Sequence, residues 1–221
     1  IGFCIGSSIF LVLLWKFIDP PLTPLMIERT VDAALEGESY EMEKDIESIS
    51  NIDPDLMRAV IASEDARFFE HFGIDWKAVD EAREYNRRHK IKKRGASTIT
   101  MQTARNVFLW HDRTWIRKGA EVYFTYLIEI LWSKERILEV YLNSIEWGGG
   151  VFGAPAATEK YFKKEPSNLS RREAALMAVV LPNPRRWSPA RPTGYILRRQ
   201  GTIQARMGAI ALPDDLKNNK K

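Results

Sequence analysis

The chain of 221 residues is predicted to fold as a mainly α-helical protein. Several segments begin with a side chain that caps helices well and continue with apolar residues three or four positions apart, the spacing of one helix face. No alternation of apolar and polar residues runs for more than four or five positions, so long strands are not indicated. Hydrophobic residues make up 45% of the chain, which is enough for a packed core and excludes an intrinsically disordered protein.

Residues 1–18 are expected to form a membrane anchor. Residues 1–14 carry no charge, and the Trp15–Lys16 pair that follows is typical of the water interface of a membrane segment. A bilayer span needs about 20 apolar residues, so we interpret this segment as a transmembrane helix that is truncated in the sequence. The alternatives are a buried helix or the core of a signal peptide, which would need small residues at a cleavage site.

Residues 19–50 are expected to link the anchor to the domain, because three prolines among residues 19–24 favour an extended spacer. Charge is segregated beyond that spacer. Residues 28–55 hold ten acidic and two basic residues, a net charge of −8, whereas residues 83–118 hold eleven basic and two acidic residues, a net charge of +9. The whole chain carries only +4. The basic segment therefore predicts an anionic partner, which could be nucleic acid, lipid headgroups or phosphate.

The first helix of the domain is expected to begin at Asp53, a capping residue followed by a proline. Its apolar face includes Glu64 and Phe68 and is expected to continue to His71, with Gly73 able to end the helix. A carboxylate in an apolar stripe is either a core residue with satisfied hydrogen bonds or a general base whose pKa is raised by desolvation. The spacing alone leaves both interpretations open.

The same signals predict further helices. Ser133 can cap one, and Ser170 with Glu173 forms a capping box that opens another. The predicted helices cover residues 114–132, the segment after Ser133, residues 174–181 and residues 195–210, with a break at the glycines of residues 148–150. We expect one domain over residues 51–210 and a polar tail over residues 211–221. Cys4 is the only cysteine, which excludes an intrachain disulfide and a cysteine-based zinc site.

Four motifs carry the chemical information. They are EDARFFEHFG at 64–73, GASTITMQTARN at 95–106, RTWIRKGAE at 113–121 and KERILEVYLN at 134–143. The second motif offers backbone and hydroxyl donors that could cradle phosphate oxygens. On a helix, Arg113, Arg117 and Glu121 of the third motif would project from one face, as in an ordinary exposed salt-bridge ladder. The fourth motif alone indicates a packing helix.

Together, and in this order, the four motifs resemble those of the family 51 glycosyltransferases, which include monofunctional biosynthetic peptidoglycan glycosyltransferases and the glycosyltransferase domain of penicillin-binding proteins. The resemblance covers roughly residues 51–207. It implies a lysozyme-like, bilobal, mostly α-helical domain, anchored by one span in the bacterial cytoplasmic membrane and lying on its outer, periplasmic face. The implied reaction is the polymerisation of lipid II, a disaccharide-peptide on undecaprenyl pyrophosphate, into glycan strands, with inversion at the anomeric carbon.

The resemblance also implies roles for individual residues. Glu64 matches the catalytic base, which takes the proton from the 4-hydroxyl of the acceptor GlcNAc. Glu121 matches a second catalytic carboxylate near the donor pyrophosphate and any divalent metal, Mg or Mn, bound there. A departing pyrophosphate needs cations more than it needs a general acid. The residues expected to bind substrate or shape the cleft are Asp65, Phe68, His71, Ser97, Thr98, Gln102, Arg105, Asn106, Arg113, Arg117 and Lys118.

Two positions depart from the family pattern. Met101 stands where the family usually has glutamine, and Arg105 where it usually has lysine, which keeps the charge but changes the donor geometry. No Ser-x-x-Lys or Lys-Thr-Gly sequence of a transpeptidase domain is present. We therefore expect a monofunctional polymerase without transpeptidase activity or an organic cofactor. Its expected partners are lipid II, the growing lipid-linked glycan, the membrane and cell-wall synthesis proteins, and no nucleic acid.

Residues 81–94, between the first two motifs, are rich in Arg and Lys. We expect a mobile loop that closes over the lipid pyrophosphate or lies on anionic headgroups. Two rival functions remain as hypotheses. A lytic glycosidase on the same fold would need an acid carboxyl beside the scissile bond. A membrane-anchored nucleic-acid-binding module would use the basic segment, but it gives no reason for Glu64 on an apolar stripe.

Overall fold

The computed structural model describes residues 2–37, 39–89, 91, 93–110, 112 and 114–217. This part of the chain is mainly helical, as predicted. The helices are α1 (Gly2–Phe17), α2 (Pro24–Glu36), α3 (Pro54–Glu64), α4 (Trp76–Arg88), α5 (Ile99–Phe108), α6 (Trp115–Leu131), α7 (Lys134–Ser144), α8 (Ala154–Phe162), α9 (Arg171–Val180), α10 (Gly194–Arg206) and α11 (Asp214–Lys217). Short 3₁₀ turns, η1 (Ile49–Asn51) and η2 (Met207–Ala209), precede α3 and follow α10.

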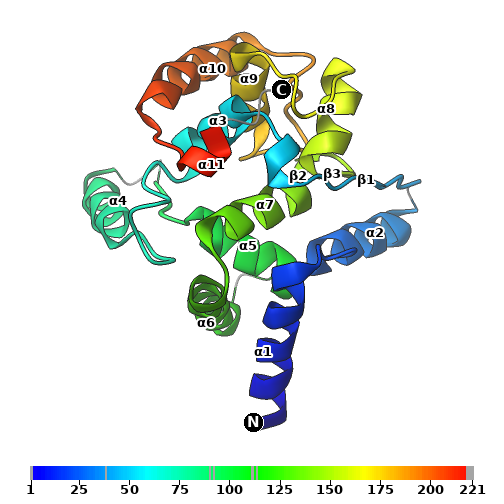
Figure 1. Ribbon diagram of the computed structural model, residues 1–221, viewed down its shortest axis with the longest axis vertical. Helices are drawn as coiled ribbons and strands as arrows, with labels where there is room; N and C mark the ends of the chain where they lie inside the picture. The colour runs from blue at the N-terminus through cyan, green and yellow to red at the C-terminus, as the bar shows by residue number, and fades with distance from the viewer. Residues whose placement is uncertain are drawn as a thin grey trace.

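Two groups of helices build the core (Figure 1). In the first group α3 packs against α9, which in turn packs against α10. In the second group α5 packs against α6 and α7. Both groups contribute to one continuous cluster of buried side chains, with Phe68, Tyr141 and Trp147 among its largest members. The C-terminal end of α3 therefore meets α5 where the two groups join, and this is where the polar residues of the first two motifs gather.

A small sheet lies beside these helices. Its strands are β1 (Glu43–Lys44), β2 (Glu146–Gly148) and β3 (Val151–Phe152), in the order β1-β3-β2. β3 pairs parallel to β1 and antiparallel to β2. The predicted glycine break is the turn between β2 and β3, in which Gly150 takes a positive φ of 77°. Strands of two or three residues are too short to produce an alternating pattern, which is why the sequence did not predict them.

Helix α1 extends away from the remainder of the molecule, as Figure 1 shows. Ser8 Oγ lies 2.8 Å from the hydroxyl of Tyr123 on α6, and two further hydrogen bonds hold the C-terminal half of α1. The indole Nε1 of Trp132 donates to the carbonyl of Val12 at 2.8 Å, and a guanidinium nitrogen of Arg136 donates to the carbonyl of Trp15 at 2.8 Å. Among the described residues, none of the helices has both the length and the apolar character needed to cross a membrane.

Most predicted helix starts are confirmed by their capping hydrogen bonds. Asp53 accepts from the N–H of Asp55 at 2.8 Å, and Ser133 accepts from the N–H of Arg136 at 3.2 Å. Ser170 forms the predicted capping box with Glu173 at the start of α9. The sequence patterns thus placed the first residues of α3, α6, α7, α9 and α10 within a few positions of where the structure has them.

Two predictions about local structure were wrong. The first helix does not continue to Gly73; α3 ends at Glu64, because the extended backbone of Asp65 (φ −160°) lets its side chain turn toward α5. Residues 81–94 do not form a loop throughout, since α4 continues to Arg88. Asp75 caps this helix by accepting the N–H of Ala78 at 2.9 Å. Lys90 and Lys92 of the same segment lie outside the described residues.

Candidate active site

Glu64 occupies the last position of α3 and faces a pocket of about 260 Å³, which Ser97 and Thr98 also line. Its carboxylate is partly buried and accepts two side-chain hydrogen bonds. Gln102 Nε2 donates to Oε2 at 3.0 Å, and Ser63 Oγ donates to Oε1 at 3.2 Å. Glu64 therefore combines features of both interpretations given for it above. Its carboxylate is hydrogen-bonded within the protein, and it is also open to a pocket.

The environment of Glu64 shifts its proton affinity. Burial raises the pKa of Glu64, while the hydrogen bonds from Gln102 and Ser63 and the positive charge of Arg199 act in the opposite direction. The negative charge of Asp65 adds to the rise. A carboxyl group whose pKa lies above the ordinary glutamate value can accept a proton more readily, as a general base must.

Gln102 connects Glu64 to the buried helix α7. While its amide nitrogen donates to Glu64, its amide oxygen accepts the hydroxyl of Tyr141 at 3.1 Å. Tyr141 is only 1% exposed. Residues from the first, second and fourth motifs thus form one hydrogen-bonded chain, Glu64–Gln102–Tyr141, contributed by α3, α5 and α7.

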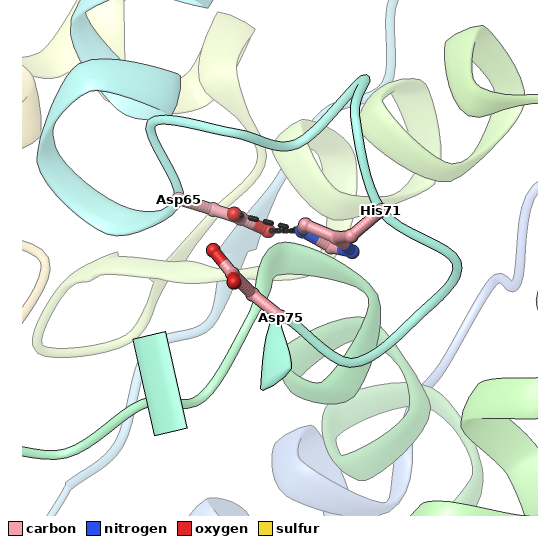
Figure 2. Close-up of side chains that lie close together, drawn as sticks. All are labelled: Asp65, His71 and Asp75. Carbon is pink, nitrogen blue, oxygen red and sulfur yellow. Dashed lines mark hydrogen bonds and ion pairs between the residues drawn. The ribbon is translucent and has the colours of Figure 1, made fainter. Parts of the chain in front are cut away.

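The first motif is also fastened to α5 through Asp65. Figure 2 shows Asp65 and His71 pointing toward each other across the turn that follows α3, with Asp75 close by. His71 Nε2 lies 2.9 Å from Asp65 Oδ1, and Asp65 Oδ2 accepts the backbone N–H of Ile99 at 3.0 Å. Asp65 and His71, predicted to bind substrate or shape the cleft, therefore hold the turn in place beside the start of α5.

Asp65, His71 and Asp75 form a group of side chains that could hold a metal ion, since one ligand atom of each lies within 4.8 Å of the others. Their oxygens already have protein donors. Arg67 donates to both oxygens of Asp75, at 2.9 and 3.0 Å. Burial alone would raise the pKa of Asp75, but the hydrogen bonds from Arg67 and from the N–H of Ala78 hold that pKa below its ordinary value. A metal here would have to displace these donors.

Thr98, which lines the pocket, also supports the turn that follows α3. Thr98 caps α5 by accepting the N–H of Met101 at 3.2 Å, and its hydroxyl donates to the carbonyl of Gly73 at 2.5 Å. Gly73 has a positive φ of 74°, which favours glycine. Phe68 is fully buried, with Lys134 Nζ 4.6 Å from the centre of its ring.

Glu121 lies in a cluster of cations on α6 and is 1% exposed. Arg117 and Lys118 each form an ion pair with one of its two carboxylate oxygens. Burial alone would raise the pKa of Glu121, but the hydrogen bonds from Lys118 and Arg117 and the charge of Arg105 hold it below the ordinary value. Of the ladder expected to be exposed, Glu121 is thus buried beside a partly buried Arg117 and a partly exposed Lys118, and its carboxylate stays ionised.

A second pocket, of about 150 Å³, is lined by Gln102. Arg105 and Asn106 line it together with Tyr141, and the Nε of Arg105 lies 3.5 Å from Oδ1 of Asn106. The charge of Arg105 acts on both Glu121 and Tyr141. Arg105 therefore connects the hydrogen-bonded chain at Glu64 electrostatically with the cation cluster at Glu121.

The structure gathers most of the predicted site residues at this junction. Arg113 lies outside the described residues. Sequence reasoning missed Tyr141, interpreted only as part of a packing helix, and the pair Arg29–Glu146, whose side chains meet at 3.1 Å and line the second pocket. A hydroxyl within the apolar face of residues 134–144 was the only signal for Tyr141.

A family comparison and a comparison with individual proteins agree with each other on what this chain resembles. The family described as Transglycosylase matches residues 31–208. A biosynthetic peptidoglycan transglycosylase of Bdellovibrio bacteriovorus is 52% identical over 207 residues, which cover 94% of this chain and 82% of that protein. Proteins with the same name from Pseudomonas putida (strain GB-1) and Rhodospirillum centenum are 50% and 51% identical, covering 96% and 93% of this chain and 89% and 87% of their own.

Proposed function

This chain belongs to the transglycosylase family, and from that premise we propose how its residues polymerise the glycan strands of peptidoglycan. The activity is that of a peptidoglycan glycosyltransferase acting on lipid II and the growing glycan. The observation that carries the proposal is the contrast between two carboxylates. Burial raises the pKa of Glu64, whereas the side chains of Lys118 and Arg117 hold the pKa of Glu121 below its ordinary value. When their environments shift the pKa values of two carboxyl groups in opposite directions in this way, the two groups are suited to different roles.

Glu64 is the general base. It takes the proton of the GlcNAc 4-hydroxyl of lipid II as that oxygen forms a bond to the anomeric carbon of the donor MurNAc. The bond from this carbon to the pyrophosphate breaks, and its electron pair leaves with undecaprenyl pyrophosphate. Attack from the opposite face inverts the anomeric carbon. The pocket beside Glu64, which Ser97 and Thr98 line, holds the acceptor sugar so that its hydroxyl reaches the carboxylate.

The cations on α5 and α6 serve the leaving group. Arg105 lines the second pocket, and Arg117 and Lys118 surround Glu121. Their positive charges stabilise the negative charge that develops on the departing pyrophosphate. Glu121 remains ionised and holds Arg117 and Lys118 in position. Arg105 offers a guanidinium in place of the usual family lysine, and can bind two phosphate oxygens at once. Asn106 and Arg113 belong to the same proposed donor site.

A divalent metal, Mg or Mn, does not fit well at Glu121 itself. Both oxygens of this carboxylate are in ion pairs with Arg117 and Lys118, and Arg105 adds a third positive charge nearby. Such a metal prefers several oxygen ligands, and the described side chains around Glu121 supply cations instead. We therefore assign no step of the reaction to a metal at this position.

We propose the membrane surface as the place of reaction, with α1 entering the cytoplasmic membrane as a single-pass anchor and the catalytic domain on its outer face. The side chains of Phe3, Phe10 and Phe17 on α1 are exposed. Beyond α1, Trp115 is 91% exposed at the start of α6, and Ile27 and Val31 of α2 line an apolar groove with Trp110. Exposed apolar surface of this extent suits contact with lipid.

These positions support the domain organisation that we propose. The two groups of helices correspond to the two lobes of a lysozyme-like domain over residues 51–210, linked by residues 19–50 to the anchor. Within the linker, α2 packs against α5 and contributes Arg29 to the second pocket. A segment with these contacts helps to build the donor side of the site in addition to spanning the distance to the membrane.

The rival hypothesis of a lytic glycosidase remains testable. A raised pKa at Glu64 would also suit a general acid, so this residue alone does not discriminate. The cations around Glu121 do, because a sugar leaving group must be protonated whereas a pyrophosphate needs positive charge. Incubation with labelled lipid II should yield glycan strands, and incubation with finished glycan should release no fragments. Fragment release without strand formation would contradict the proposed function. Running the lipid II reaction with and without Mg or Mn would measure the metal requirement.

A further inference from the structure

The hydroxyl of Tyr141 is buried beneath the catalytic base and has one partner in the described part of the chain, the amide oxygen of Gln102. Burial and the nearby charge of Glu64 raise the pKa of Tyr141 well above its ordinary value. The phenol is therefore protonated at neutral pH, and its buried proton requires an acceptor.

This requirement determines which way the Gln102 amide faces. An amide presents an acceptor at one end and donors at the other. With its oxygen toward Tyr141, the nitrogen faces Glu64 and donates to Oε2 at 3.0 Å. If the amide rotated by half a turn, the phenol proton would lose its acceptor in a buried place, and the amide oxygen would approach the carboxylate of Glu64. Both changes are unfavourable.

We propose that Tyr141 is a positioning residue for the catalytic base, because its hydroxyl holds the Gln102 amide with the donor end toward Glu64. This inference rests on the proposed function of Glu64. A fixed donor stabilises the ionised form of the carboxylate, which is the form that can take the acceptor's proton, and it also restrains the carboxylate oxygens in one place. Tyr141 acts on Glu64 through Gln102, which bonds to both residues.

Other groups also influence the ionisation of Glu64. Ser63 donates from the same helix, Asp65 follows in the chain, and Arg199 contributes positive charge from α10. Arg105 acts on Tyr141 from α5. These groups are unchanged when only the hydroxyl of Tyr141 is removed, so a Tyr141→Phe variant isolates the contribution of the held amide.

The test is kcat/KM for lipid II polymerisation as a function of pH. In Tyr141→Phe the Gln102 amide can rotate, so ionised Glu64 loses a hydrogen-bond donor that was fixed in place. At the acid end of the profile kcat/KM should therefore fall by about fivefold relative to its alkaline plateau, a typical factor for one hydrogen bond. Gln102→Leu, which removes the amide, should move the acid limb in the same direction. Tyr161→Phe is the matched control, because this half-buried tyrosine lies on α8 and has no hydrogen bond to Glu64 or Gln102 among the described contacts.

The double variant tests whether the effect of Tyr141 on the acid limb passes through Gln102. If Tyr141 acts through Gln102, adding Tyr141→Phe to Gln102→Leu should move the acid limb no further. An equal loss of rate at every pH, an acid limb that coincides with that of the control, or an additive shift in the double variant would overturn the proposal. Should Tyr141→Phe fail to fold in a thermal unfolding measurement, an unmoved acid limb in Gln102→Leu would overturn it alone. Any of these results would leave the role of Glu64 standing, because that role is tested by removing Glu64 itself.

Discussion

The carboxylate of Asp65 accepts the backbone N–H of Ile99 at 3.0 Å, and this hydrogen bond joins the end of α3 to the start of α5. The same carboxylate binds His71 at 2.9 Å. One buried side chain thus fixes the relative position of the first and second motifs, and with them the distance between Glu64 and Gln102.

We predict that Asp65→Ala destabilises the protein by about 1–3 kcal/mol, because it leaves the N–H of Ile99 and the ring of His71 without their acceptor. Chemical unfolding of the variant and the wild type measures this difference. Asp214→Asn serves as the control, since the side chain of Asp214 is 93% exposed. Equal midpoints for Asp65→Ala and the control would contradict this structural role.

Gly73 is expected to resist substitution. A Cβ added there would lie 2.7 Å from Cγ2 of Thr125, and the φ of 74° is strained for any other residue. Gly73→Ala should therefore lower the free energy of unfolding by about 1–3 kcal/mol. Gly201→Ala on α10 meets nothing within 4 Å of the added atom and should be neutral or slightly stabilising. The comparison fails if the two variants unfold alike.

The sequence predicted the helices with clear start signals, and it could not predict those parts that depend on tertiary contacts. Asp53, Ser133 and Ser170 cap their helices with local hydrogen bonds, so their positions are readable from neighbouring residues. The end of α3 is different, because the side chain of Asp65 bonds to Ile99, 34 positions away. Nothing near Asp65 in the sequence indicates that partner.

The catalytic assignment shows the same division. The motifs singled out Glu64 and Glu121 as candidates, but the opposite directions of their pKa shifts come from burial and from the side chains that surround them. The ladder of Arg117 and Glu121 looked like an exposed face because spacing carries no information about burial. Tyr141 went unnoticed because the sequence does not show that its hydroxyl meets the amide oxygen of Gln102, 39 positions away.

Lys118→Met should reduce turnover more than it reduces substrate binding. The variant removes one of the cations that we assign to the departing pyrophosphate, and kcat should fall by about 10²-fold. Steady-state kinetics with lipid II measures kcat and KM separately. Lys77→Met, which removes an exposed lysine on α4, provides the control for net charge. A similar small decrease in both variants would argue against a specific role for Lys118.

Glu64 should lower the stability of the folded protein at neutral pH. Its pKa is raised by burial in the folded state, so the ionised form is disfavoured there relative to the unfolded chain. Glu64→Gln should therefore raise the unfolding midpoint at neutral pH. The gain should shrink as the pH falls through the raised pKa, and it should disappear below the ordinary glutamate pKa, where both states bind the proton. Unfolding curves at several pH values measure the difference, and a gain that grows on acidification would have the wrong sign.

The central claim is that Glu64 is the base of glycan-strand polymerisation, and the most direct test is glycan formation from labelled lipid II by the Glu64→Gln variant. The substitution keeps the shape of the side chain and removes its ability to take a proton. We predict a fall in rate of about 10²-fold or more, with an unfolding midpoint at neutral pH no lower than that of the wild type. Near-normal strand formation by the folded variant would contradict the account.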